Sequence, residues 1–216
     1  LYGTQGLNVF GDIQSQQALL EHLHHVCRIG AGLGASRLVF GSPRNRDRTG
    51  LNDAQAHEQA VAFFRQAGDV ASRHGVMLCL EAVAPLYGAN FMTTTLGCAT
   101  VVRAVNHPAL RMLLDTGAMQ INGEDPQDVM PHTADITEHI HLSEPGLIPY
   151  GDGNADYERV RDNLVQHVPR CTATLEILPG KAEPALLAMA RSLAFATALY
   201  RPHAVKPGAG GQEHGA

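Results

Sequence analysis

Residues 76–81 read VMLCLE, a short apolar run that ends in a carboxylate. An apolar run of this length after a glycine, here Gly75, is typical of a buried strand. Side chains alternate along a strand, so Met77, Cys79 and Glu81 lie on one face. The segment therefore predicts a buried strand with an acid at its carboxyl end.

Similar short apolar runs recur along the chain, and segments with helical periodicity separate them. The further runs are Leu1–Gly3 (the end of a strand), Arg37–Phe40, Arg111–Leu114, His139–Leu142 and Thr172–Leu178. Strands that alternate with helices at intervals of about 30 residues predict parallel βαβ units. We therefore expect an α/β fold, either a (β/α)8 TIM barrel or an open doubly wound sheet.

Capping residues mark where the intervening helices begin. The expected helices run from Ser15 to Ile29, from Asn52 to His74, from Thr94 or Thr95 to Asn106, from Asp125, from Asp156, and from Glu183 to Tyr200. Because Gly75 follows the second of these directly, it gives that helix a clear end.

Composition limits the classes of function. The chain has 216 residues, 44% of them hydrophobic, and a net charge of −5. This predicts one well-buried domain without the basic face that binds nucleic acid, and no apolar run is long enough to span a membrane. The four cysteines show no CxxC spacing, so we expect reduced core residues and a cytoplasmic location.

Four residues that can bind a metal fall at the ends of four successive predicted strands. They are Glu81, Asp115, His141 and Glu176, separated by 34, 26 and 35 residues, each close to one βα repeat. The carboxyl ends of parallel strands meet at one rim, where barrel enzymes build their active sites. Taken singly, such an acid is usually a helix cap and such a histidine usually a core residue, but four together favour one site.

A metal ion explains this set of residues. Three carboxylates that converge inside an apolar barrel cannot all stay ionised without a compensating cation. One divalent ion would provide that charge and accept neutral imidazole as a fourth ligand. An oxygen-rich set with one nitrogen favours Mn²⁺ most, then Mg²⁺ or Co²⁺, and Zn²⁺ less.

The four segments LCLEAV (78–83), LLDTGAM (113–119), HIHLSEP (139–145) and ATLEIL (173–178) also carry a family resemblance. Together they resemble the xylose isomerase-like TIM barrel superfamily, especially its sugar phosphate isomerase/epimerase members such as the tagatose epimerases. The resemblance covers about residues 1–200. It implies a (β/α)8 barrel whose last four strands hold one divalent metal through the four residues, with Glu81 and Glu176 as the acid/base pair.

The function implied is a metal-dependent isomerase or epimerase of a small sugar, sugar phosphate or polyhydroxy acid. Glutamates would transfer a proton through a metal-stabilised enediolate, giving an epimer or an isomer according to where the proton returns. The alternatives are a cyclitol-type dehydratase of the same superfamily and a non-catalytic metal-binding barrel. Endonuclease IV, a third relative, is disfavoured by the negative charge and by the missing histidines at the strand ends.

Five further residues follow the strands and are candidates for substrate binding: Asn45, Arg46, Tyr87, Asn90 and Glu144. Arg46 lies in GSPRNR (41–46), where a solvated loop charge is the alternative interpretation. The resemblance also has gaps. Tagatose-type epimerases have a histidine at the position of Ala118. They also have an arginine shortly after the histidine ligand, whereas residues 145–149 of this chain contain no arginine.

Placing the four ligands on the last four strands leaves the first two βα units outside this chain. We therefore expect residues 1–200 to form the third to eighth βα units of a longer barrel, and residues 201–216 to be a flexible tail. Such a piece, expressed alone, is expected to fold poorly. The expected partner is a small sugar-like molecule, with no nucleic acid or membrane, and a homo-oligomer is one expected state.

Overall fold

The computed structural model describes residues 4–178, 180 and 183–201. Five strands form one sheet in it, with the order β1–β2–β3–β4–β5, and every neighbouring pair is parallel. The strands are β1 (Arg37–Phe40), β2 (Met77–Glu81), β3 (Leu110–Asp115), β4 (Thr137–Leu142) and β5 (Thr172–Leu175). The predicted strand end at Leu1–Gly3 and the predicted tail beyond Arg201 lie outside the described residues.

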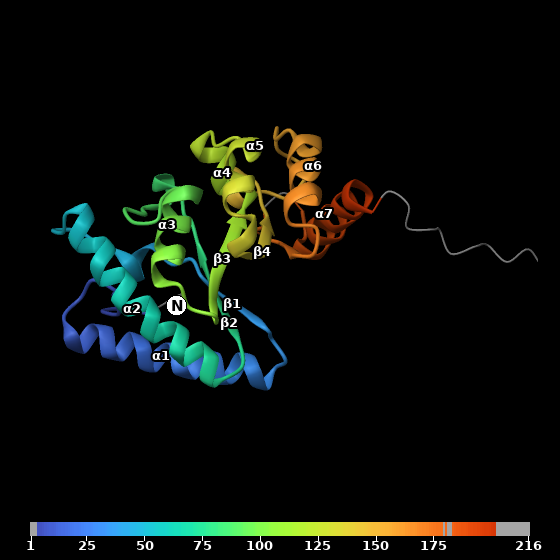
Figure 1. The fold of residues 1–216 in the computed structure, drawn as a ribbon. Coiled ribbons are helices and arrows are strands. Elements are labelled where there is room, and N and C mark those ends of the chain that lie inside the picture. The colour runs from blue at the N-terminus through green and yellow to red at the C-terminus, as the bar shows by residue number, and fades with distance from the viewer. Residues whose placement is uncertain (1–3, 179, 181–182, 202–216) are drawn as a thin grey trace, which may run out of the picture.

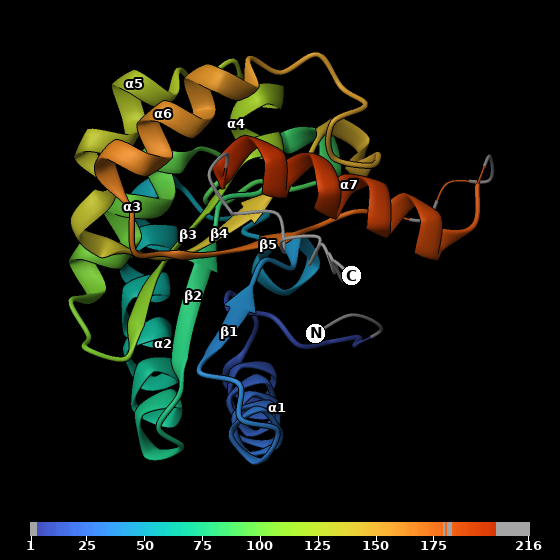
Figure 2. The same ribbon diagram turned by 90° about the vertical axis from the view of Figure 1, so that its right-hand side faces the viewer.

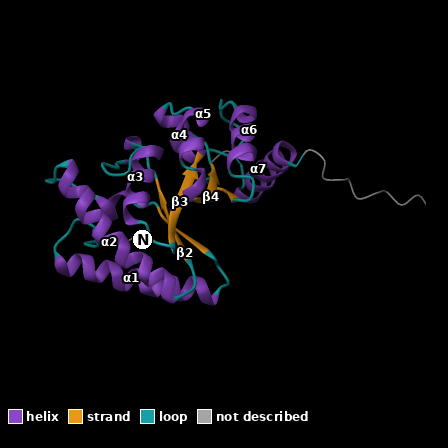
Figure 3. Ribbon diagram, in the orientation of Figure 1, coloured by secondary structure: helices purple, strands orange, loops and turns teal. Residues whose placement is uncertain are grey.

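Helices connect the strands, so the chain is a series of βα units (Figures 1 and 3). The α-helices are α1 (Ile13–Gly32), α2 (Asp53–Arg73), α3 (Thr95–Val105), α4 (Thr116–Asn122), α5 (Pro126–Val129), α6 (Tyr157–His167) and α7 (Ala185–Tyr200). Short 3-10 helices occupy several loops: η1 (Pro43–Arg46), η2 (Pro85–Tyr87), η3 (Met130–His132), η4 (Ala134–Ile136) and η5 (Pro145–Leu147).

The capping residues explain most of the helix starts. Asn52 forms a capping box with Gln55 at the start of α2, because each side chain accepts a hydrogen bond from the other residue's backbone N–H. Thr94, Asp125 and Asp156 cap α3, α5 and α6 in the same general way, as their positions in the sequence predicted. Helix α4 was not predicted.

The sheet curls, and a contact between distant strands shows it. The Arg37 side chain on β1 reaches the backbone of β4, where its Nε donates a hydrogen bond to the Glu138 carbonyl at 2.9 Å, although two strands separate β1 and β4 in the sheet. A flat sheet would hold these residues too far apart, because neighbouring strands lie about 4.8 Å apart. The architecture is therefore part of a (β/α) TIM barrel and not an open doubly wound sheet.

The two faces of the sheet carry different residues. Alternate strand residues, including Leu78, Leu80, Met112, Leu114 and Ile140, belong to the hydrophobic core together with residues of α2 and α3. Figure 1 shows α1, α2 and α3 on this side of the strands. The opposite face, toward the barrel interior, carries the predicted ligand residues, so the core fixes the strands that position them.

Both outer strands have an open edge in the part of the chain that the structure describes. Residues 172–174 of β5 are exposed, and Val39 of β1 is 37% exposed. Figure 2 shows β1 at its edge of the sheet, next to α1. Within the described residues, no helix has the length and apolar character to cross a membrane. All four cysteines are free, and Cys27, Cys79 and Cys98 are buried, in line with the predicted core role.

Candidate metal centre

The four predicted ligands lie at the carboxyl ends of four neighbouring strands. Glu81 and Asp115 are the last residues of β2 and β3, His141 is the last but one of β4, and Glu176 follows β5 directly. The strand register pairs Asp115 with His141. It also pairs Glu81 with Leu113, two residues before Asp115, and His141 with Thr174, two residues before Glu176. Because residues two apart on a strand point to the same face, all four ligand candidates share the inner face.

Their side chains converge on one point. His141 Nδ1 lies 3.0 Å from Glu81 Oε1, 3.1 Å from Glu176 Oε2 and 3.8 Å from Asp115 Oδ2. One donor atom from each of the four residues lies within 4.8 Å of the other three. Two ligands on opposite sides of a Mg²⁺ ion lie roughly 4 Å apart. The cluster thus has the size and the donor atoms that suit one divalent cation.

The charges of the cluster depend strongly on one another. Burial raises the pKa of Glu81, and the carboxylates of Asp115 and Glu176 add to this, while the hydrogen bond with His141 opposes it. For His141, burial would lower the pKa, but the carboxylates of Asp115, Glu176 and Glu81 raise it to about 11. Without a metal ion, the His141 side chain would therefore be protonated, and its positive charge would offset part of the negative charge of the three carboxylates.

Asp115 is held in place by two donors to one oxygen. Its Oδ1 accepts hydrogen bonds from the Ala118 N–H and from the Ser143 hydroxyl, both at 2.7 Å. Burial would raise the pKa of Asp115, but the hydrogen bonds from His141, the Ala118 N–H and Ser143 keep it below its ordinary value. Asp115 also caps helix α4, whose positive N-terminal end favours an ionised carboxylate.

Glu81 depends on a residue without a side chain. A Cβ atom at Gly41 would lie 1.8 Å from Glu81 Oε2, so only glycine leaves room for this carboxylate. From the other side, the guanidinium of Arg46 donates a hydrogen bond to the backbone carbonyl of Glu81 at 2.7 Å. Gly41 and Arg46 both lie in the segment between β1 and α2, and together they fix the end of β2.

The cluster opens into a cavity of about 590 Å³. Besides the four ligand candidates, its lining includes Val39, Gly41, Ser42, Pro43, Ala82, Val83, Tyr87, Gly117, Ala118, Ser143, Glu144 and Leu147. This volume is within the range of small-molecule sites. The side chain of Glu176 is 42% exposed and lines this cavity, whereas the side chain of Glu81 is 10% exposed.

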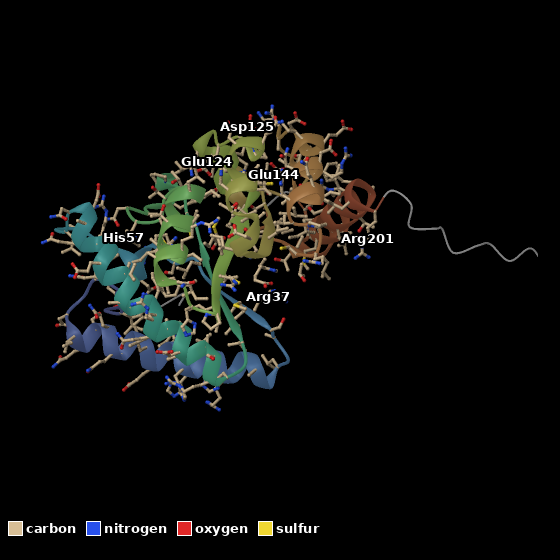
Figure 4. All side chains as sticks on the ribbon, in the orientation of Figure 1. Arg37, His57, Glu124, Asp125, Glu144 and Arg201 are labelled. Atoms are coloured by element: carbon tan, nitrogen blue, oxygen red, sulfur yellow. The ribbon has the colours of Figure 1, made fainter. Side chains whose placement is uncertain are left out.

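Two of the five predicted substrate residues line this cavity. Tyr87 accepts a hydrogen bond from the Gly146 N–H at 2.8 Å, which links the loop after β2 to the loop after β4. Glu144 is buried, and its Oε1 accepts from the Gly151 N–H at 3.2 Å and from the Tyr157 hydroxyl. Figure 4 labels Glu144 near the carboxyl ends of the strands and Arg37 near their amino ends.

The other three predicted substrate residues, Asn45, Arg46 and Asn90, are not among the residues that line the cavity. The amide of Asn45 donates to Thr4 Oγ1 and to the Leu7 carbonyl, and so ties the N-terminal segment to η1. Arg46 is fully buried, so it is not the solvated loop charge that the sequence left open. Asn90 donates to Asp47 Oδ1 within the surface loops. These side chains are used in holding loops together.

Sequence reasoning missed three residues that shape the site: Gly41, Thr116 and Ser143. Of these three, only Thr116 had a signal in the sequence. Asp115 is followed by TGAMQING, in which an N-cap aspartate and Gly123 at the far end indicate a short helix, and α4 forms there. Ser143 is close to His141 in HIHLSEP, but a serine next to a ligand has no signal of its own until the strands are paired.

A family model described as xylose isomerase-like TIM barrel matches residues 5–198. No curated protein matches the chain.

Solved structures of sugar epimerases share the fold. An L-ribulose 3-epimerase superposes with a TM-score of 0.73 at 18% identity, over 88% of this chain and 63% of that one. The D-psicose 3-epimerase of Clostridium cellulolyticum H10 gives 0.78 at 17% identity, over 91% and 76%. The 3-keto-D-glucoside 4-epimerase of E. coli gives 0.74 at 16% identity, over 87% and 74%. This chain thus spans less than two thirds of the L-ribulose 3-epimerase.

Proposed function

Because the chain belongs to the xylose isomerase-like TIM barrel family, we propose that it is a divalent-metal-dependent isomerase or epimerase. Its substrate would be a small sugar, a sugar phosphate or a polyhydroxy acid. One observation carries the proposal: three carboxylates and an imidazole converge within 4.8 Å of one another beside a cavity of about 590 Å³. The similar structures of three sugar epimerases support the sugar-like substrate.

The donor set fits one hard divalent cation. Glu81, Asp115 and Glu176 would each provide a carboxylate oxygen, and His141 would provide Nδ1. Such a set suits Mn²⁺ best, with Mg²⁺ or Co²⁺ as substitutes. Bound there, the ion would polarise the carbonyl group of a sugar and its neighbouring hydroxyl, which makes the adjacent C–H bond more acidic.

In the proposed reaction, Glu81 and Glu176 would move the proton. Glu81 ends β2 and Glu176 follows β5, so they come from the two outer strands of the four that carry the ligands. Glu81 Oε1 and Glu176 Oε2 lie at similar distances from His141 Nδ1, 3.0 and 3.1 Å. A substrate bound in the cavity beside the cluster would meet one of these carboxylates on each side of the reacting carbon. One glutamate would remove the proton and the other would return it from the opposite side, which inverts the carbon.

Tyr87 and Glu144 are the proposed contacts to substrate hydroxyl groups. The Tyr87 oxygen already accepts a hydrogen bond from the Gly146 N–H and keeps its own proton to donate. Glu144 Oε2 is buried without a hydrogen-bond partner in the described part of the chain, so a substrate hydroxyl that reached it would find a free acceptor. Both residues line the same cavity as the four ligand candidates.

Metal binding is the first test of this proposal. We would remove metal with a chelator and titrate Mn²⁺, Mg²⁺, Co²⁺ and Zn²⁺ back by calorimetry. One tight site is expected, and Asp115→Ala should lose it. Asp156→Ala is the matched control, because Asp156 also caps a helix but lies outside the cluster. Binding that is indifferent to Asp115 would show that the cluster is not a metal centre.

Glu176→Gln tests proton transfer separately from metal binding. The amide oxygen can still bind metal, but the group cannot accept a proton. Proton–deuterium exchange in D₂O into a ketose that the unmodified chain exchanges, with D-psicose among those screened, should therefore fall by roughly 10²- to 10⁴-fold. Mn²⁺ affinity should largely remain. The exposed Glu58→Gln is the control for loss of a charge. Exchange that survives in Glu176→Gln would remove Glu176 from the reaction.

A further inference from the structure

The hydroxyl of Ser143 is enclosed between the ends of two strands. Its Oγ donates to Asp115 Oδ1 at 2.7 Å and accepts from the Gly117 N–H at 3.0 Å. Ser143 is 2% exposed, so water does not compete for these bonds. A Cβ atom on Gly117 would lie 2.5 Å from this hydroxyl, so glycine is needed for the close approach. The hydroxyl therefore has one position and one direction in which to donate.

A second pair of bonds fixes the backbone of Ser143. Its N–H donates to Thr116 Oγ1 at 3.0 Å, and the Thr116 hydroxyl donates to the Ser143 carbonyl at 3.0 Å. These bonds extend the contact between β3 and β4 beyond the last register pair, which is Asp115 with His141. The two ligand candidates are thus joined by side-chain bonds directly after the strands that carry them.

The consequence for Asp115 concerns which oxygen faces the centre. Its Oδ1 is taken by Ser143 and by the Ala118 N–H, and Oδ2 is the atom 3.8 Å from His141 Nδ1. The terminal torsion of aspartate is broad and close to two-fold, so a carboxylate with fewer partners samples more orientations. Two donors on one oxygen leave the other oxygen directed at the cluster.

We propose that Ser143 is a positioning residue for the metal centre: its hydroxyl orients the Asp115 carboxylate so that Oδ2 is presented to the ion. This inference rests on the proposed metal-dependent function. Groups that hydrogen-bond to metal ligands typically change metal affinity by 10- to 100-fold when removed. A merely structural serine would instead affect folding stability and leave metal affinity unchanged.

The test is Mn²⁺ titration by calorimetry of the chelator-stripped chain, beside thermal unfolding without metal. Ser143→Ala should bind Mn²⁺ about 10- to 100-fold more weakly, and Ser143→Thr, which keeps the hydroxyl, should regain most of that affinity. Thr137→Ala is the matched control. It removes a buried hydroxyl on β4 that donates to the Thr133 carbonyl at 2.8 Å, far from the cluster. It should lower the unfolding temperature without changing Mn²⁺ affinity.

The possible outcomes separate the two ideas. If the unmodified chain shows a cooperative thermal unfolding transition and binds no Mn²⁺, the proposed function fails and the role of Ser143 fails with it. If the unmodified chain and Ser143→Ala bind Mn²⁺ equally well, only the role of Ser143 is overturned. Should Ser143→Ala not fold, Thr116→Val decides the question, because it keeps the shape of Thr116 but removes both bonds that hold Ser143. It too should weaken Mn²⁺ binding.

Discussion

At the scale of single residues, the buried carboxylates of the cluster differ in how firmly they hold their charge. Asp115 has three donors and a helix N-terminus, which keep its pKa below the ordinary value. Glu81 has equal burial and fewer donors, so burial raises its pKa. Asp115 thus suits the role of a permanently charged ligand, whereas Glu81 can hold a proton, as a residue that exchanges protons with substrate must.

The pKa of His141 predicts how metal affinity depends on pH. In the metal-free chain this pKa is raised to about 11, so His141 is protonated at neutral pH. A metal binds only the neutral imidazole, and binding must therefore release a proton. Mn²⁺ affinity should rise about tenfold per pH unit between pH 6.5 and 8.5.

Calorimetry in two buffers of different ionisation enthalpy measures directly how many protons are released when Mn²⁺ binds. About one proton per bound ion is expected. Affinity that does not change with pH over this range would contradict the assignment of His141 as a ligand in this cluster.

At the scale of the secondary structure elements, the site is made by where strands stop. β2, β3 and β4 each end at or next to a ligand candidate, and β5 is followed directly by one. The loop after β1 contributes no ligand candidate, but it contributes space through Gly41 and support through Arg46. The chemistry of one strand end therefore depends on the neighbouring βα unit.

Gly41→Ala tests this dependence. The new Cβ atom would overlap Glu81 Oε2, and the flexible carboxylate should move away while the strands stay in place. We expect a loss of Mn²⁺ affinity of more than about tenfold, with little change in the circular dichroism spectrum. Gly32→Ala is the control, because a Cβ atom there meets nothing within 4 Å. Unchanged affinity in Gly41→Ala would mean that Glu81 does not bind the ion in this conformation.

At the scale of the whole molecule, the described chain is a curled sheet with two open edges. The β5 strand is exposed, and several apolar side chains of α7 are exposed as well: Leu186, Leu187, Met189 and Leu193. Helix α7 packs against α6 (Figure 1), and these four side chains stay exposed among the described residues. Unpaired strand edges and grouped apolar side chains favour association with other chains.

We therefore expect this 216-residue chain to self-associate in solution, increasingly at higher concentration. Light scattering across a concentration series measures this. Leu186→Lys with Leu193→Lys should reduce the association, because charges on an exposed surface oppose it. The exposed Gln17→Lys on α1 is a control for added charge elsewhere. A monomer at all concentrations would show that these surfaces do not attract other chains.

The sequence by itself determined the order of parallel βα units, most helix starts and the four converging residues. These follow from local chemistry: alternation along strands, caps at helix starts, and one acid or histidine per repeat. Only the tertiary structure decided that Arg46 is buried behind Glu81 and that Asn45 and Asn90 bind within loops. It alone revealed that Ser143 holds Asp115. Those roles depend on strand register and on the curl of the sheet, which bring together residues that no local pattern connects.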